Sequence, residues 1–293
     1  MNPERKNIHS YKFVEPQLTV LRGLRARLDL GNKDDFKTSY GNLLGILNTE
    51  VNTTVVHTLV QFYDPPLRCF TFQDYQLAPT LEEYSHILGI RIKNQVPYVR
   101  TKELLKYQVL AEALHIGKKE VELNLKHKGG IHGFTLMFLV DKSIAFAEAG
   151  SWMNFNANLA LLIYGIVLFP NMEEFVDLAA IHIFLTQNHV PTLLADTYYS
   201  IHVRTQKKKG TIACCTYLLY RWFISHLPNK GPFIENKDNL KWSQRIMSLN
   251  AEDISWYSRI YDNIKLILNC GDFSNVPLLG MKGGINYDLR LAL

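Results

Sequence analysis

The sequence predicts a mainly α-helical protein, a single multi-helix globular domain with a small β element near residues 68–98. Three observations lead to this prediction. Apolar residues recur at helical spacing through most of the 293 residues. Hydrophobic residues make up 47% of the chain, which is enough to bury a substantial core. Strands that alternate with helices, the mark of an α/β protein, are absent outside one short stretch, so we expect about ten helices around one core.

The β element falls in the stretch 70–98, which carries the clearest local pattern in the chain. Pro79 holds the residue before it in an extended conformation, and Thr80 stands where a helix N-cap belongs. Glu83 completes a capping box, and Gly89 marks the left-handed end of the helix 81–88. On both sides of this helix, apolar and polar residues alternate as in strands, at Phe70, Phe72, Ile90 and Ile92. The stretch therefore predicts a strand–helix–strand unit.

The N-terminal segment 1–33 is basic, with seven Lys and Arg against three Asp and Glu, a net charge of +4. Leucines recur in it at helical spacing, at Leu18, Leu21, Leu24 and Leu28. We expect an amphipathic helix that docks on the rest of the protein. The alternative is a nucleic-acid-binding arm.

The segment 34–293 is predicted to form a helical domain. Its first helix runs to residue 48 and is expected to be capped by Asp34 or Asp35. The helix 173–187 is expected to begin with Glu173 and Glu174 at the positive end of its dipole. The stretch 126–133 reads as a loop because of its glycines. Further helices are expected at 53–62, 101–115, 118–126, 134–149, 158–169, 192–205, 212–226, 242–249 and 251–262.

Composition narrows the class of protein. The four cysteines include no C-x-x-C pair, so we expect free thiols in a reducing compartment rather than a disulfide framework or a zinc module. No apolar signal core opens the sequence. The longest apolar run, 159–169, is half the roughly 20 residues that a membrane span needs. We therefore expect an intracellular protein without a membrane partner.

The strongest local charge asymmetry lies between residues 197 and 234, where six basic residues occur and no acidic one. The total net charge of +5 permits an acidic partner without requiring one. The candidate nucleic-acid contacts are Arg204, Lys207, Lys208 and Lys209. The three consecutive lysines also suit a nuclear import signal, or a solvated turn that complements the C-terminal end of the preceding helix.

No motif predicts a catalytic or metal site. Cys214 and Cys215 fall in a predicted apolar helix without a positioned base, so we expect them to pack as small hydrophobes. Two histidine pairs lack a third ligand nearby in the sequence, His127 with His132 and His182 with His189. We expect no cofactor, no metal and no small-molecule ligand.

Asp177 and Asp196 are unusual because each stands in an apolar run, where a carboxylate needs a partner. We expect internal salt bridges that fix helix register, with the partner drawn from Arg68, Arg91, Arg204 and Arg221. The alternative is a degenerate transposase-like or nuclease-like site formed by Asp177, Asp196 and Glu173. Burial against arginines would exclude that alternative, and an open cleft without them would favour it.

Several motifs resemble the plant mobile domain, a family often described as aminotransferase-like, and in particular its legume branch of domains of unknown function. The matching segments are Y-D-P-P-L-R-C-F-T-F at 63–72, A-P-T-L-E-E-Y at 78–84, L-L-I-Y-G-I-V-L-F-P at 161–170, V-D-L-A-A-I at 176–181, L-L-A-D-T-Y-Y-S at 193–200 and the segment 270–287. The resemblance is weakest between 100 and 155. Its structural signature in this chain is Pro79, Thr80, Glu83, Gly89, Asp177 and Asp196.

The resemblance implies a protein that is not an enzyme, is associated with transposable elements and has a nuclear or chromatin role. The implied partners are nucleic acid or chromatin proteins, and the implied location is the nucleus rather than the cytoplasm. Pyridoxal-phosphate chemistry is not expected, because the pattern lacks alternating strand–helix units. Relatives continue into an R-Q-x-G motif beyond the last matching segment, so a chain truncated at its C-terminus is expected.

Overall fold

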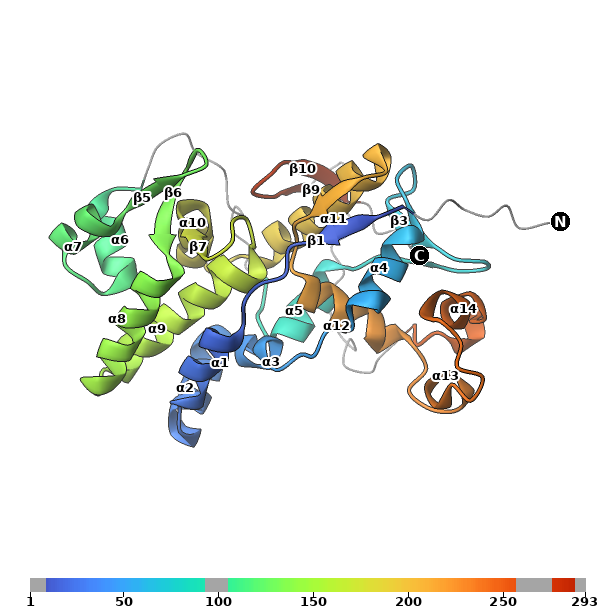
Figure 1. Cartoon of the computed structure of the whole chain (residues 1–293), viewed down its shortest axis with the longest axis horizontal. Coiled ribbons are helices and arrows are strands. Elements are labelled where there is room, and N and C mark those ends of the chain that lie inside the picture. The colour runs from blue at the N-terminus through green and yellow to red at the C-terminus, as the bar shows by residue number, and fades with distance from the viewer. Residues whose placement is uncertain (1–8, 93–104, 257–275, 288–293) are drawn as a thin grey trace.

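In the computed structural model, which describes residues 9–92, 105–256 and 276–287, helices predominate and four small sheets lie among them (Figure 1). The prediction of a mainly α protein is confirmed at this level. Buried apolar side chains form one cluster that extends from Tyr11 to Met281. No helix within the described ranges is long and apolar enough to cross a membrane.

The leucines of the N-terminal segment face the core. β1 (Tyr11–Phe13) leads into α1 (Thr19–Ala26), which buries Leu21 and Leu24. Leu18 and Leu28, on either side of the helix, are also buried. Arg22 and Arg25 of α1 lie on the other faces of this amphipathic helix, because the leucine spacing puts the apolar residues together.

The single helix predicted from 34 to 48 is two helices, α2 (Leu30–Tyr40) and α3 (Leu43–Leu47). The predicted caps are wrong, because Asp29 caps α2 by accepting a hydrogen bond from the backbone N–H of Asn32 at 2.7 Å. Gly41, at φ +64°, ends α2 so close to the carbonyl oxygen of Leu88 that a Cβ atom would overlap it. α4 (Thr53–Gln61) follows.

The predicted β element is a three-stranded antiparallel meander, and all of it precedes the capped helix. Its strands pair in chain order, and α5 (Leu81–Leu88) follows them. Residues 90–92 form no strand, so the second strand of the predicted unit is wrong there, and 93–98 lie outside the described residues. The backbone of Ile90 is hydrogen-bonded to the end of α5 instead of to a strand. Its N–H donates to the carbonyl oxygen of Ser85, and its carbonyl oxygen accepts from Ser85 Oγ. The strands are β2 (Tyr63–Asp64), β3 (Cys69–Thr71) and β4 (Gln76–Leu77).

A second three-stranded sheet replaces a predicted loop and the start of a predicted helix. β5 (Lys126–Lys128) and β6 (Ile131–Thr135) form a hairpin, and β7 (Phe175–Asp177) pairs with the other edge of β6. The helix predicted at 173 therefore begins only at residue 178, because the residues before it are paired in the sheet. The helices of this part are α6 (Tyr107–Leu114), α7 (Lys118–Asn124), α8 (Leu136–Glu148), α9 (Trp152–Ile163) and α10 (Leu178–Thr186).

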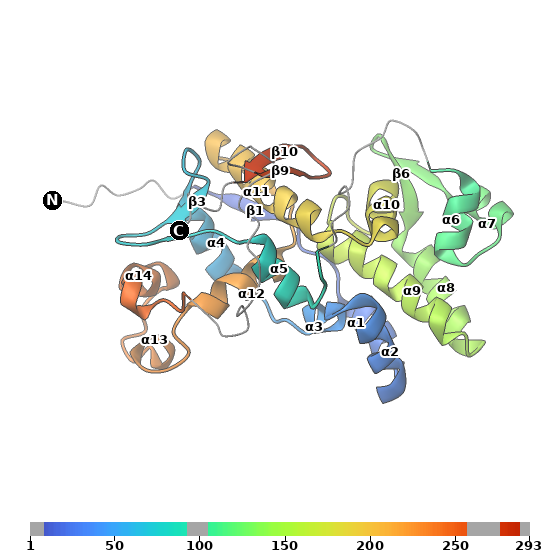
Figure 2. The ribbon, with the colours of Figure 1, turned by 180° about the vertical axis from the view of Figure 1, so that it is seen from behind.

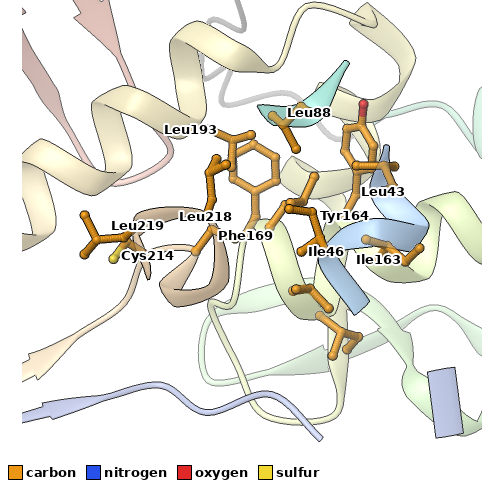
Figure 3. Packing of buried hydrophobic residues seen from close by; sticks show 14 of the residues in the cluster. Leu43, Ile46, Leu88, Ile163, Tyr164, Phe169, Leu193, Cys214, Leu218 and Leu219 are labelled. Atoms are coloured by element: carbon orange, nitrogen blue, oxygen red, sulfur yellow. The ribbon is translucent and has the colours of Figure 1, made fainter. Parts of the chain in front are cut away.

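The apolar run predicted to be a buried helix lies at the centre of the core. α9 continues into a π-helical turn, η1 (Tyr164–Leu168), whose five residues are all buried. Gly165 in this turn lies so close to Val176 of β7 that a Cβ atom would overlap the Val176 side chain. Figure 3 shows that Ile163 and Tyr164 pack among side chains of α3, α5 and the later helices. A glycine is therefore required where the π-turn meets the sheet.

The C-terminal part of the chain contacts the N-terminal segment through two short parallel strands. β8 (Gly210–Ile212), which follows α11 (Val190–Lys207), pairs with β1. The helix predicted from 212 begins at 216 as α12 (Thr216–His226), so Cys214 and Cys215 precede the helix instead of lying within it. A hairpin of β9 and β10 lies along α11 (Figure 2). The remaining elements are α13 (Pro232–Glu235), α14 (Trp242–Met247), η2 (Ala251–Asp253), β9 (Val276–Leu279) and β10 (Gly284–Tyr287).

Candidate functional site

Basic side chains gather where α11 ends and β8 begins. Lys208 adopts the left-handed conformation at φ +54° and ends the helix. The parallel pairing of β1 with β8 sets Lys12 beside Thr211. Arg204 folds back over Gly210, and its Nε donates to the carbonyl oxygen of Thr211 at 3.0 Å. We call the resulting set the basic corner: Lys12, Arg204, Lys207, Lys208 and Lys209.

The cations of the basic corner face solvent. Lys12 and the three consecutive lysines are exposed, and Arg204 is half-buried. Among the described residues, none of the five forms an ion pair with a carboxylate. The end of α11 carries a partial negative charge, which favours lysines there for helix stability as well. The corner can therefore hold an anion without first breaking a salt bridge.

Another cation, Arg68 between β2 and β3, lies near α11. Arg68, at φ +57°, donates from Nη1 to the carbonyl oxygen of Asn286 at 2.7 Å. Burial lowers the pKa of His202 on α11, and the nearby guanidinium of Arg68 lowers that pKa further. His202 is thereby kept neutral more readily, and Arg68 adds a positive charge beside the basic corner.

Asp196 forms no salt bridge with any of the four candidate arginines, all of which the structure describes, and this corrects the prediction of an internal arginine salt bridge. It lies on α11, 5% exposed, and accepts backbone hydrogen bonds from Met281 and Lys282 in the turn between β9 and β10. Its Oδ1 has no hydrogen-bond partner among the described residues. Burial raises the pKa of Asp196 to about 7, against the opposing effect of the Lys282 charge. Gly280 is so close that a Cβ atom would overlap Oδ1.

Asp177 is the N-cap of α10 and not a helix-face neighbour of Glu173, and it pairs with no arginine in the part of the chain that the structure describes. Its Oδ1 accepts from the backbone N–H of Ala180, and its Oδ2 from Nδ2 of Asn171, both at 2.7 Å. Burial raises the pKa of Asp177, and these two hydrogen bonds oppose the shift. Both oxygens are thus occupied in fixing the start of the helix.

The three carboxylates proposed for a nuclease-like site are not gathered in a cleft. Asp177 and Asp196 are buried and lie within electrostatic range of each other and of Lys282. Glu173 is exposed in the turn before β7. It lines an open cleft of about 340 Å³ together with Glu15 and Glu174, and neither aspartate lines that cleft. No group of three or more His, Cys, Asp or Glu in the described ranges could hold a metal.

The thiols that the structure describes are free and buried: Cys69, Cys214 and Cys215. Burial raises the pKa of all three thiols, that of Cys215 to about 12. Because the thiolate is the nucleophilic form, these cysteines are suited to packing and not to attack on a substrate.

Glu83 has partners that the sequence did not reveal. Within the capping box it accepts from the backbone N–H of Thr80, and the backbone N–H of Glu83 donates to Thr80 Oγ1. It also accepts from Nε1 of Trp222 at 2.9 Å and lies 2.9 Å from Nε2 of His226. Gly89 stands in the left-handed conformation at φ +63°, and the carbonyl oxygen of Pro79 accepts from the hydroxyl of Tyr198. Pro79 and Glu83 therefore join the start of α5 to α11 and α12.

Comparison with known proteins places the chain in a family. A family model described as a domain of unknown function, DUF7745, matches residues 21–293. No curated protein and no solved structure matches the chain. The match begins within α1 and covers the meander, both aspartates, the basic residues that follow α11 and the C-terminal hairpin. The chain therefore belongs to the DUF7745 family of domains of unknown function.

Proposed function

We propose that the chain is a non-enzymatic protein, similar to the plant mobile domain, that binds the phosphate backbone of nucleic acid through the basic corner. The resemblance to that domain supports a nuclear, chromatin-related role and an association with transposable elements. The buried, hydrogen-bonded state of Asp177 and Asp196 supports a protein without enzyme activity, because neither carboxylate is presented to a substrate.

The observation that carries the proposal is the clustering of five cations without carboxylate partners among the described residues. Pairing β1 with β8 brings Lys12 to a turn that is almost 200 positions later in the chain, so the cluster is larger than its sequence run. Phosphate contacts from Lys and Arg supply most of the affinity of non-specific binding. The proposed ligand is therefore the backbone of a nucleic acid, bound without readout of its sequence.

The test is binding of a fluorescently labelled 20-base-pair duplex, followed by anisotropy at low salt. A triple variant, Lys207→Gln, Lys208→Gln and Lys209→Gln, is compared with the unchanged protein. The matched control is Lys37→Gln, Lys118→Gln and Lys119→Gln, which removes the same charge from exposed sites on α2 and α7.

We expect the corner variant to bind at least about tenfold more weakly and the control variant to bind nearly as well as the unchanged protein. A single-stranded DNA and an RNA of the same length show whether the corner prefers one backbone. If the two triple variants lose the same affinity for the duplex, the loss comes from net charge alone, and the proposed site is contradicted. Absence of binding to all three nucleic acids at low salt would remove the proposed function.

A further inference from the structure

The hairpin of β5 and β6 sets two histidines opposite each other. Its turn consists of Gly129 and Gly130, whose φ values of +57° and +81° are typical of a two-residue type I′ turn. Lys128 and Ile131 flank the turn, and the next pair along the ladder is His127 with His132. In such a ladder this second pair is the one without mutual backbone hydrogen bonds, in which the side chains approach most closely.

The two imidazoles of this pair lie together and are free to bind. Their ring centroids are 4.6 Å apart, with the planes inclined at 47°. His127 is exposed and His132 is half-buried, so both rings can be reached from solvent. Neither ring makes a hydrogen bond or an ion pair with any residue that the structure describes. Four ring nitrogens are therefore available at one spot on the hairpin.

The charges next to the pair do not oppose a cation on that face. Side chains alternate between the two faces of a strand, so Lys126 and Lys128 point away from the face that carries His127. Lys126 in addition donates from Nζ to the carbonyl oxygen of Leu123. Neither of these two lysines therefore lies on the face that carries the imidazoles.

We propose that His127 and His132 form a two-histidine site for a divalent transition-metal ion. Imidazole nitrogen suits Zn²⁺, Ni²⁺ and Cu²⁺, with metal–nitrogen bonds of about 2.0–2.1 Å. Two such bonds at a tetrahedral angle place the nitrogens about 3.3 Å apart, a separation that rings with centroids 4.6 Å apart reach by small rotations. Water completes the coordination. Cu²⁺ is expected to bind most tightly, in keeping with the usual order of affinity among these metals.

The site was not evident from the sequence because five positions around two glycines give no ligand geometry by themselves. The antiparallel ladder supplies that geometry, since it fixes both side chains on one face before a metal arrives. The proposal is independent of the basic corner and concerns a different sheet.

The experiment uses the full chain without an affinity tag, titrated with Cu²⁺ and followed by calorimetry and electron paramagnetic resonance. The unchanged protein is expected to bind one Cu²⁺ with hyperfine splitting from two nitrogens. His127→Gln and His132→Gln are each expected to lower the affinity at least about tenfold, because each removes the chelate. The control is His115→Asn, which deletes another exposed imidazole and suits the left-handed conformation at that position.

Two outcomes would overturn the proposal. One is a Cu²⁺ signal and affinity that are the same in both hairpin variants as in the unchanged protein. The other is an equal loss in the His115→Asn control, which would show scattered binding to surface histidines. Circular dichroism of each variant without metal confirms that the fold is retained, so that a loss of binding reports on the ligands themselves.

Discussion

Replacement of Glu83 by alanine is expected to destabilise the protein by about 3–7 kcal/mol. The Glu83 carboxylate lies where α5 meets α12, with its side chain 15% exposed. It accepts from the backbone of Thr80 and from Trp222, both at 2.9 Å, and lies 2.9 Å from the ring nitrogen of His226. The Glu83 side chain thus takes part in the capping box of α5 and also joins α5 to α12.

The magnitude follows from the groups that lose a partner. The backbone N–H of Thr80 loses its acceptor in the capping box, at about 1 kcal/mol. The indole N–H of Trp222 and the ring N–H of His226 would each be left buried without an acceptor, at about 1–3 kcal/mol apiece. Thr80→Ala removes only the cap, so it is expected to lower the free energy of unfolding by about 1 kcal/mol. The difference between the two variants isolates the contact between helices.

The assay is urea unfolding followed by tryptophan fluorescence and circular dichroism at pH 6. Glu83→Ala, Thr80→Ala, His226→Gln and the double variant of positions 83 and 226 form a set with one double-mutant cycle. A coupling energy above 1 kcal/mol between Glu83 and His226 is expected for a buried charged pair. If Glu83→Ala lowers stability no more than Thr80→Ala, the reasoning about the contact with α12 is refuted.

The same pair predicts a pH dependence. Burial alone would raise the pKa of Glu83, but its bonds with His226 and Thr80 outweigh burial and lower it. Burial alone would lower the pKa of His226, but Glu83 and the carbonyl of Ser255 raise it. The glutamate contribution is present above its ordinary pKa of 4.5 and is lost as the pH falls through the folded-state value. The histidine contribution is present below 6.5 and is lost as the pH rises through its raised value. The stability difference between the unchanged protein and His226→Gln is therefore expected to be largest between pH 4.5 and 6.5.

Three further substitutions test Asp196 on α11, Gly165 in the π-turn and Gly23 in α1. Because burial raises the pKa of Asp196 from 3.8 to about 7, the unchanged protein is expected to lose stability as pH rises between these values. Asp196→Asn is expected to flatten that part of the pH–stability curve, and an unchanged curve would contradict the assignment. Gly165→Ala is expected to lower the free energy of unfolding by about 1–3 kcal/mol through overlap with Val176, whereas Gly23→Ala, which meets no neighbour in α1, is expected to raise it by about 0.5–1 kcal/mol. Thermal unfolding of both variants tests whether Gly165→Ala lowers the stability and Gly23→Ala raises it.

Local patterns were readable from the sequence where the signal lies within a few residues. The capping box of Thr80 and Glu83 and the left-handed Gly89 are formed as the spacing indicates. The start of α10 shows the limit of such patterns. The sequence predicted a helix start at Glu173 and Glu174, but the residues after them pair with the edge of β6. Asp177 is therefore the N-cap of α10. An unpaired sheet edge is a property of the folded protein and leaves no mark in the local sequence.

Contacts between distant parts of the chain were beyond the sequence patterns. Trp222 lies 139 positions from Glu83, and no spacing rule links them. The carboxylate of Asp196 was expected to find an arginine, but backbone N–H groups of the β9–β10 turn and the charge of Lys282 take that place. Every residue except proline has a backbone N–H, so residue types do not show which backbone groups will bind a carboxylate. For the same reason Lys12 could not be assigned to the basic corner until the pairing of β1 with β8 was known.

The most direct test of the proposed function is the salt dependence of duplex binding. If all five cations of the basic corner contact phosphates, the logarithm of the association constant falls against the logarithm of salt with a slope of about −4.5. Affinity then drops about 500-fold between 50 and 200 mM salt, and the triple lysine variant, with two cations left, shows a slope of about −1.8. The same slope for both proteins, or a flat titration, would contradict binding through the basic corner.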